Sequence, residues 1–324
     1  MRFVLLLVFG TSVAGAQTVP ALKLEQTIPL PDVQGRIDHM SIDTQGHRLF
    51  VSALGNNTVE VVDLKEGKRA ETVSGVQEPQ GVLYVASNNR LYVANSKDGT
   101  VKVFDGTSLK LLKTIAYGED ADNLRHDSSK DHVYVGYGGG ALGELDAGGQ
   151  KVADIELGSH PESFQLEKNS PRIYVNLPKS RKIAVVDREK HSVLASWGTG
   201  LSLANYAMAL DEPDHRLFVV TRYPARLLVF DTTSGKIIQT LSAVGDCDDL
   251  FFDSARRRIY AIGGEGAISV FAQLDPDHYS ELARIPTVKG ARTGFFAPGL
   301  NRLFVGVRKQ GAATAAIEVF EAKP

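Results

Sequence analysis

The chain has 324 residues, of which 43% are hydrophobic and 23% are charged. This apolar content is enough for a large buried core, and the length alone would allow two domains. The 36 basic residues nearly balance the 38 acidic ones, and no run of Lys or Arg is long enough to mark a nucleic-acid or membrane surface, so we expect neither a nucleic-acid partner nor a membrane-surface role.

The N-terminus has the pattern of a secretory signal peptide. A basic residue at position 2 precedes an apolar run over residues 3–9, which is too short to cross a bilayer, and Ala-Gly-Ala at residues 14–16 forms a cleavage pattern. The only cysteine, Cys247, lies far from the cleavage point, so we expect neither a lipid anchor nor an internal disulfide. The sequence therefore predicts a signal peptide over residues 1–16 and an exported domain, periplasmic or secreted, over residues 17–324.

The most informative stretch is RLYVANSKDGTVKVFD at residues 90–105. Its first half alternates, with Leu91 and Val93 on one face and Tyr92 and Ala94 on the other, as a β-strand does. A Lys-Asp-Gly turn and a second alternating segment follow, and this pattern predicts a β-hairpin.

The same hairpin pattern occurs seven times in the sequence. The other copies begin at Arg48, His132, Arg172, Arg216, Arg258 and Arg302, so the starts advance by 42, 42, 40, 44, 42 and 44 residues. A period in the low forties with several strands per unit is typical of propeller blades. With RLYVAN at residues 90–95 as its closest copy, the repeat resembles the YVTN family of bacterial β-propeller repeats over nearly all of the mature chain. That resemblance implies a fold and an extracytoplasmic location, but no particular activity.

Each unit has the order inner strand, hairpin, outer strand, and the last unit lacks its outer strand. The segment LKLEQTIPL at residues 22–30 has the outer-strand pattern and precedes the first unit. We therefore predict an all-β, seven-bladed propeller of four-stranded blades, closed by an N-terminal strand that completes the last blade. A closed ring has no edge that requires a partner, so a monomer is expected.

Candidate site residues lie just before each inner strand, because the loops that enter inner strands surround the central channel. Counting back 12 and 10 residues from each hairpin gives a polar column. Blades two, three, four and six contribute acidic residues, whereas blades seven and one contribute Arg292 and Arg36, the latter with Asp38. Carboxylates and an Asn at a channel rim suit a hard cation such as Ca²⁺ or another divalent ion. The candidate metal ligands are Asp120, Asp122, Asn123, Glu162, Asp246, Asp248 and Asp249.

The arginine pair would suit a small anionic ligand, such as a carboxylate or phosphate. The candidate ligand-binding residues are Arg36, Arg292, Glu78, Asn205 and Tyr206. His39 and His160 are candidate catalytic residues, because imidazole titrates nearest neutral pH.

Two functional interpretations remain open. The first is an exported binding or scaffold protein that recognises a small anionic ligand or a protein partner loop at the channel rim. The second is a divalent-metal-dependent hydrolase or lyase, since lactonases of the gluconolactonase type and streptogramin lyases look like distant architectural cousins, although their motifs are not recognisable here. A third, purely structural interpretation is that these polar residues line a water-filled channel and cap turns.

Three other features are interpreted as structural. The glycine-rich stretch at residues 136–143 occupies the hairpin-turn slot of the other units, and no helix follows it, so it is not a phosphate-binding loop. Cys247 is flanked by carboxylates, which would raise the pKa of its thiol and so make it a poor nucleophile; this favours a buried structural thiol. Trp197 falls in an outer-strand slot, which favours packing between blades.

Overall fold

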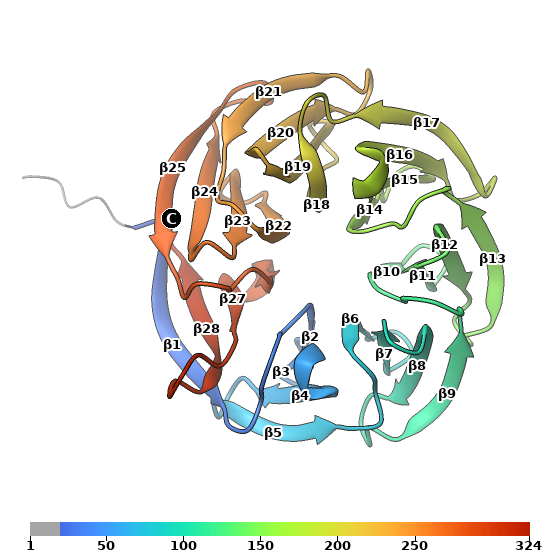
Figure 1. Ribbon diagram of the computed structural model, residues 1–324, viewed down its shortest axis with the longest axis vertical. Coiled ribbons are helices and arrows are strands. Elements are labelled where there is room, and N and C mark those ends of the chain that lie inside the picture. The colour runs from blue at the N-terminus through green and yellow to red at the C-terminus, as the bar shows by residue number, and fades with distance from the viewer. Residues whose placement is uncertain (1–19) are drawn as a thin grey trace, which may run out of the picture.

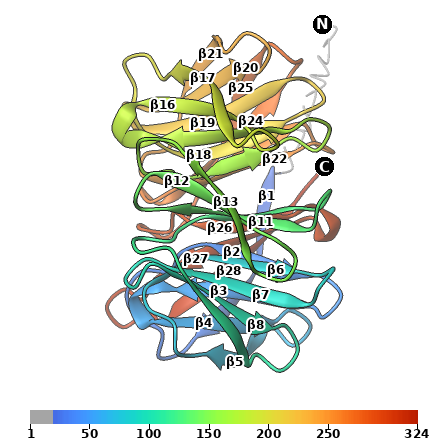
Figure 2. The ribbon, with the colours of Figure 1, turned by 90° about the vertical axis from the view of Figure 1, so that its right-hand side faces the viewer.

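Each sequence repeat folds into a four-stranded antiparallel sheet, and seven such sheets surround a central axis (Figure 1). A computed structural model describes residues 20–324. The predicted signal peptide, residues 1–16, lies outside the described residues. Figure 2 shows the ring edge-on, with the strands crossing the thickness of the disc. The seven-bladed propeller predicted from the repeat is confirmed.

The strands follow the order expected from the repeat. Blade one consists of β2 (Met40–Asp43), β3 (Arg48–Ala53), β4 (Thr58–Asp63) and β5 (Lys68–Val73). Blade two consists of β6 (Pro79–Val85), β7 (Arg90–Asn95), β8 (Thr100–Asp105) and β9 (Leu111–Ala116). Blade three consists of β10 (Leu124–Asp127), β11 (His132–Tyr137), β12 (Ala141–Leu145) and β13 (Lys151–Glu156). Blade four consists of β14 (Phe164–Leu166), β15 (Arg172–Leu177), β16 (Lys182–Asp187) and β17 (Ser192–Gly198). Blade five consists of β18 (Leu203–Asp211), β19 (Arg216–Tyr223), β20 (Ala225–Asp231) and β21 (Ile237–Ser242).

Blade six consists of β22 (Cys247–Asp253), β23 (Arg258–Gly263), β24 (Ala267–Gln273) and β25 (Tyr279–Pro286), and blade seven combines β26 (Gly294–Ala297), β27 (Arg302–Val307) and β28 (Ala315–Ala322) with β1 (Leu22–Leu30). Three short 3₁₀ turns lie between strands, at Leu54–Asn56, Pro178–Ser180 and Pro298–Leu300. Within residues 20–324, no helix has both the length and the apolar character needed to cross a membrane.

Apolar packing between neighbouring blades holds the ring together. The second strand of each blade is buried almost throughout, because its sheet packs against a neighbour on each face; in β7 only Arg90 is partly exposed. The outer strands are largely exposed, and in β9 only Ile115 is buried. Trp197 stacks between Tyr174 of its own blade and Phe230 of the next, with ring centroids 5.4 and 6.1 Å away, which confirms its role in blade packing.

The hairpin turns follow the sequence signals. In blade two, Gly99 has φ of +59°, and a Cβ there would lie 2.4 Å from the backbone nitrogen of Glu119, so the turn requires glycine. The glycine-rich stretch of blade three forms the turn between β11 and β12, as predicted.

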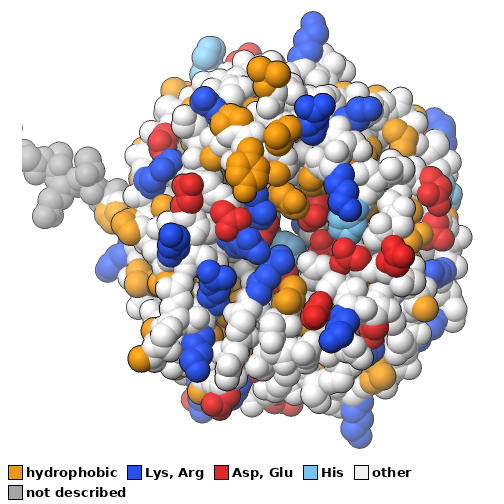
Figure 3. Space-filling model, in the orientation of Figure 1, with side chains coloured by type: hydrophobic (Ala, Val, Ile, Leu, Met, Phe, Trp, Pro, Cys, Tyr) orange, Lys and Arg blue, Asp and Glu red, His pale blue; other side chains and the backbone are white. Residues whose placement is uncertain are grey.

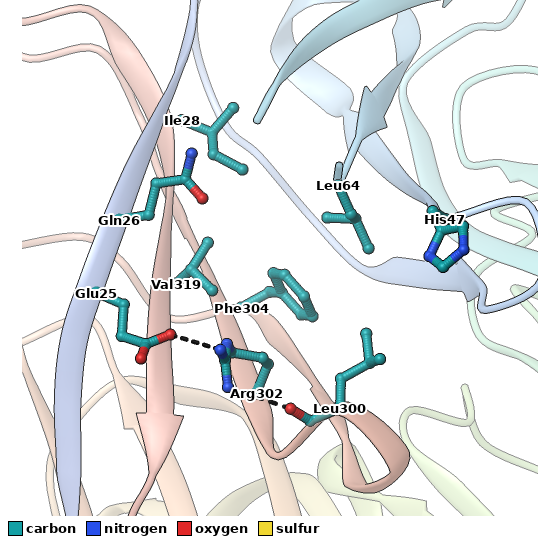
Figure 4. A pocket seen from close by; sticks show the side chains of 9 residues that line it. All are labelled: Glu25, Gln26, Ile28, His47, Leu64, Leu300, Arg302, Phe304 and Val319. Carbon is teal, nitrogen blue, oxygen red and sulfur yellow. Dashed lines mark hydrogen bonds and ion pairs between the residues drawn. The ribbon is translucent and has the colours of Figure 1, made fainter. Parts of the chain in front are cut away.

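The ring closes where the sequence predicts. β1 pairs antiparallel with β28, from Leu22 opposite Ala322 to Leu30 opposite Ala315. Ile28 and Leu30 join a core that blade seven shares with blade one. A groove of about 460 Å³ remains at this seam, and Figure 4 shows Ile28 and Val319 on its blade-seven side, across from Leu64 and His47 of blade one. The ion pair from Arg302 to Glu25, at 2.8 Å, spans β27 and β1 in the same view.

Candidate functional site

The segments that lead into the inner strands hold polar side chains at one opening of the channel. In blades one, three and four the backbone makes the same bonds there: Asp38 N donates to Ser52 O (2.7 Å), Asp122 N to Gly136 O (2.9 Å) and Glu162 N to Asn176 O (3.0 Å). Residues ten positions before each hairpin therefore form a ring around the opening. This ring consists of Asp38, Gln80, Asp122, Glu162, Tyr206, Asp248 and Arg292.

Figure 3 shows acidic and basic side chains gathered around this opening. On the basic side, each guanidinium already faces a carboxylate. Arg36 Nη2 lies 2.8 Å from Asp38 Oδ2, and Arg292 Nε lies 2.7 Å from Asp248 Oδ2. Arg292 also reaches Asp246, at 3.0 Å. The predicted arginine pair is thus brought together with internal acidic partners, which compete with any anionic ligand.

A third arginine, Arg222, joins this group. It donates to Asp248, lies 3.5 Å from Asp246 Oδ1, and stacks over the Tyr206 ring at 4.1 Å from its centroid. Arg222 was not among the predicted site residues, because it belongs to β19, the second strand of blade five, rather than to a segment before an inner strand. A weak signal was present six residues after each hairpin start: blades two, three, four and six carry Ser, Gly, Pro and Gly there and blade one carries Leu54, whereas blades five and seven carry Arg222 and Arg308.

His39 lies between the carboxylates of Asp249 and Asp38, on the same side of the opening as the arginines. Its Nδ1 lies 3.2 Å from Asp249 Oδ1, and its Nε2 lies 3.8 Å from Asp38 Oδ1. Burial alone would lower the pKa of His39, but the charges of Asp249 and Asp38 outweigh it and raise that pKa to about 10. The imidazole is therefore a fixed cation at neutral pH, which suits it poorly to carry protons.

The opposite side of the opening carries carboxylates around His160. Its Nε2 lies 3.7 Å from Glu162 Oε1, 3.8 Å from Asp120 Oδ2 and 4.0 Å from Asp122 Oδ2. One ligand atom each from Asp122, His160 and Glu162 can be chosen so that all three lie within 4.8 Å of one another. This spacing matches the first shell of a metal ion, whose ligand atoms lie 2.0–2.6 Å from it and so about 3–4.5 Å apart.

Asp122 is the most constrained member of this cluster. Its side chain is buried, with the residue only 3% exposed, and its Oδ1 has no hydrogen-bond partner among residues 20–324. Burial and the charges of Asp38 and Asp120 raise the pKa of Asp122 to about 7 despite the opposing charge of His39. Burial and the charge of Asp122 likewise raise the pKa of Glu162. Burial lowers the pKa of His160. The cluster thus lacks positive charge.

The space beside the cluster is small. A cavity of about 20 Å³ is lined by Asp122 and Glu162 of the acidic cluster and by Arg36, His39, Gln80, Asn123, Ser163, Tyr206 and Asp248. Such a volume holds roughly one water molecule or one ion. It does not hold an organic ligand.

The remaining predicted residues divide between the site and the scaffold. Asn123 is buried and lines the cavity, and its Oδ1 has no partner in the described part of the chain. Asn205 is fully buried, and its Nδ2 donates to Asn176 Oδ1 and Lys182 O, both at 2.9 Å, so it supports the backbone instead. Glu78 is partly exposed and does not line the cavity. Cys247 is buried and its Sγ lies 3.3 Å from Asp249 O, as expected for a structural thiol.

The arginines and His39 form ion pairs with Asp246, Asp248 and Asp249. The predicted set of metal ligands therefore separates into two groups. Asp246, Asp248 and Asp249 balance internal cations, whereas Asp120, Asp122 and Glu162 surround His160.

No protein-family model matches the chain. In sequence it is similar to YncE of Salmonella typhimurium, described as uncharacterized, with 24% identity over 247 residues, or 70% of this chain and 69% of that protein. A shorter similarity, 27% over 120 residues and 36% of each chain, relates it to eukaryotic translation initiation factor 3 subunit I of Drosophila grimshawi.

Many solved structures resemble this ring, and two of them illustrate the similarity. A chain of Kuenenia stuttgartiensis hydrazine synthase superposes with a TM-score of 0.73 at 17% identity, covering 85% of this chain and 93% of that one. A chain of the mitotic checkpoint complex superposes with a TM-score of 0.78 at 13% identity, covering 100% and 99%. At these identities the similarity supports the fold alone. The comparisons therefore establish a seven-bladed β-propeller with sequence similarity to YncE.

Proposed function

We propose that this chain is an exported binding propeller of the YVTN type that holds one divalent metal ion at the channel opening. Asp122, His160 and Glu162 would be the ligands, with Asp120 beside them. The observation that carries the proposal is the carboxylate of Asp122, which is buried, has an oxygen without a partner in the described chain, and lies within ligand spacing of His160 and Glu162.

The balance of charge supports a cation rather than an anion at this opening. On one side, four cationic groups face the four carboxylates of Asp38, Asp246, Asp248 and Asp249; these cations are Arg36, Arg222, Arg292 and His39. On the other side, three carboxylates surround one imidazole whose pKa is lowered by burial. Like charges packed in this way are costly without a counter-ion, and a divalent ion would supply one.

The ligand types narrow the choice of ion. The sequence alone suggests Ca²⁺, which takes oxygen ligands. The structure adds the imidazole of His160, and a mixed set of carboxylate and imidazole is better suited to Mn²⁺, Fe²⁺ or Zn²⁺. We therefore expect a transition-series ion to bind more tightly than Ca²⁺.

A metal-dependent hydrolase is the second candidate. Two of the three proposed ligands, Asp122 and Glu162, line a cavity with room for about one water, and a catalytic metal site likewise keeps a coordination position open. Turnover of a lactone by the metal-loaded protein, lost in Glu162→Gln, would favour this candidate over simple binding.

The test is calorimetric titration of the chelator-treated protein with Mn²⁺, Zn²⁺ and Ca²⁺. We expect about one Mn²⁺ or Zn²⁺ per chain, and roughly tenfold or greater weakening in Asp122→Asn and in Glu162→Gln. Glu66→Gln is the matched control, because Glu66 lies in a turn outside the channel with 61% of its side chain exposed. Equal affinity in all four proteins, or no binding by the wild type, would refute the proposal.

A further inference from the structure

A second chamber lies deeper in the channel. Each inner strand places one residue against the axis seven positions before the hairpin start; these residues are Ser41, Leu83, Arg125, Gln165, Ala209, Phe251 and Phe295. All but Ala209 line a cavity of about 260 Å³, which we call the inner chamber. His39 and Asn123 border both this chamber and the small cavity beside the acidic cluster, so they separate the two spaces.

Arg125 is the unusual residue of the inner chamber. Its Nη1 donates to the carbonyl oxygen of the adjacent Leu124 (2.8 Å), and its Nη2 lies 3.5 Å from Ser163 Oγ. Across residues 20–324, no carboxylate lies within 4.0 Å of its guanidinium, in contrast to Arg36, Arg222 and Arg292. A guanidinium has five N–H donors, so several donors of a partly buried cation remain unmatched.

The other walls of the inner chamber are mainly apolar. Met40, Val82, Leu83, Phe251, Phe295 and Phe296 line it. Its one carboxylate, that of Asp249, accepts a hydrogen bond from Gly294 N (2.9 Å) and faces His39. Because His39 and Asp249 neutralise each other, the inner chamber has one surplus positive charge, on Arg125, beside aromatic and aliphatic surface.

We propose that the inner chamber binds a small organic monocarboxylate with an apolar body. The carboxylate would accept two parallel hydrogen bonds from Arg125, which is the arrangement that a guanidinium favours. The apolar body would lie against Phe251 and Phe295. The cavity volume limits the ligand to a short aliphatic or single-ring acid, since sites for drug-sized molecules begin at about 300 Å³. This site is separate from the proposed metal site and does not depend on it.

The probes are benzoate and hexanoate, titrated by calorimetry into the mature protein in the presence of a chelator, with neutral benzamide as the uncharged analogue. We expect both acids to bind, benzamide not to bind measurably, and Arg125→Gln to lose roughly tenfold or more in affinity. Arg257→Gln is the matched control, because that arginine is 47% exposed outside the channel. Because the chelator keeps metal out of the channel opening, acid binding under these conditions is distinguished from binding to a metal ion.

Several outcomes would overturn the proposal. These are failure of both acids to bind, equal binding of benzamide and benzoate, or unchanged binding in Arg125→Gln. If Arg125→Gln does not fold, acid binding is measured in Arg125→Lys instead, because lysine keeps the positive charge but cannot make the two parallel hydrogen bonds. Weakened acid binding in the folded Lys variant supports the proposal, and undiminished binding contradicts it.

Discussion

Ring closure by β1 can be tested with one buried side chain. Ile28 is 1% exposed and packs in the core shared by blades seven and one. Truncating a buried isoleucine to alanine removes apolar contact and leaves a cavity, at a cost of about 2–5 kcal/mol. For a domain of this size, each kcal/mol lowers Tm by about 2 °C, so Ile28→Ala should melt roughly 4–10 °C lower.

The control is Leu24→Ala on the same strand, where the side chain is 46% exposed and the expected change is within about 0.5 kcal/mol. Deleting residues 17–30 is the stronger perturbation. It removes Leu22, Ile28 and Leu30, each worth about 1.5–3 kcal/mol of burial, together with the whole pairing to β28. That sum approaches the total stability of about 5–15 kcal/mol. Calorimetric melting of Ile28→Ala that matches Leu24→Ala, or normal melting of the deletion, would refute closure by β1.

Three further predictions concern charge and packing. Without metal at pH 8, Asp122→Asn should be more stable than the wild type, on the order of 2 kcal/mol in chemical denaturation, because it removes a buried charge among carboxylates. Adding Mn²⁺ should stabilise the wild type more than the variant. Because the pKa of His39 is raised from 6.5 to about 10 in the folded protein, its ion pairs stabilise fully below pH 6.5 and lose that effect as pH rises to 10. His39→Gln should therefore lose less stability than the wild type between pH 7 and 10, and parallel pH profiles would contradict this. Trp197→Ala should cost about 3 kcal/mol by loss of stacking between blades four and five, and an unchanged melting temperature would exclude that role.

The fold could be predicted because its determinants are local and repeated. Each hairpin carries its own alternation and turn residues, as in residues 90–105, and the missing last outer strand left Leu22–Leu30 as the one segment able to complete the ring. The polar ring could also be predicted, since equal spacing from the hairpins places Asp122, Glu162 and Asp248 at equivalent depth in the channel.

The partners of these side chains could not be predicted, because irregular backbone and residues from other strands decide them. The pairing of β18 with β19 shifts register between Asn205 and Ala207, and Asn205 turns into the interior of the blade. Arg222 reaches the opening from β19, outside the column that the spacing identifies. The inner chamber was not predicted for a different reason: Leu83, Ala209, Phe251 and Phe295 of its ring are apolar and Ser41 and Gln165 are uncharged, so the column has no cluster of charged residues to mark it.

The central claim is that Asp122, His160 and Glu162 hold a divalent ion at the channel opening. Crystals of the chelator-treated protein soaked in Mn²⁺ and measured for anomalous scattering would test it directly. The account predicts an anomalous peak bonded to one atom from each of these three side chains, and its loss in Glu162→Gln. A channel without a peak, or a peak bound instead by Asp246 and Asp248 on the arginine side, would contradict it.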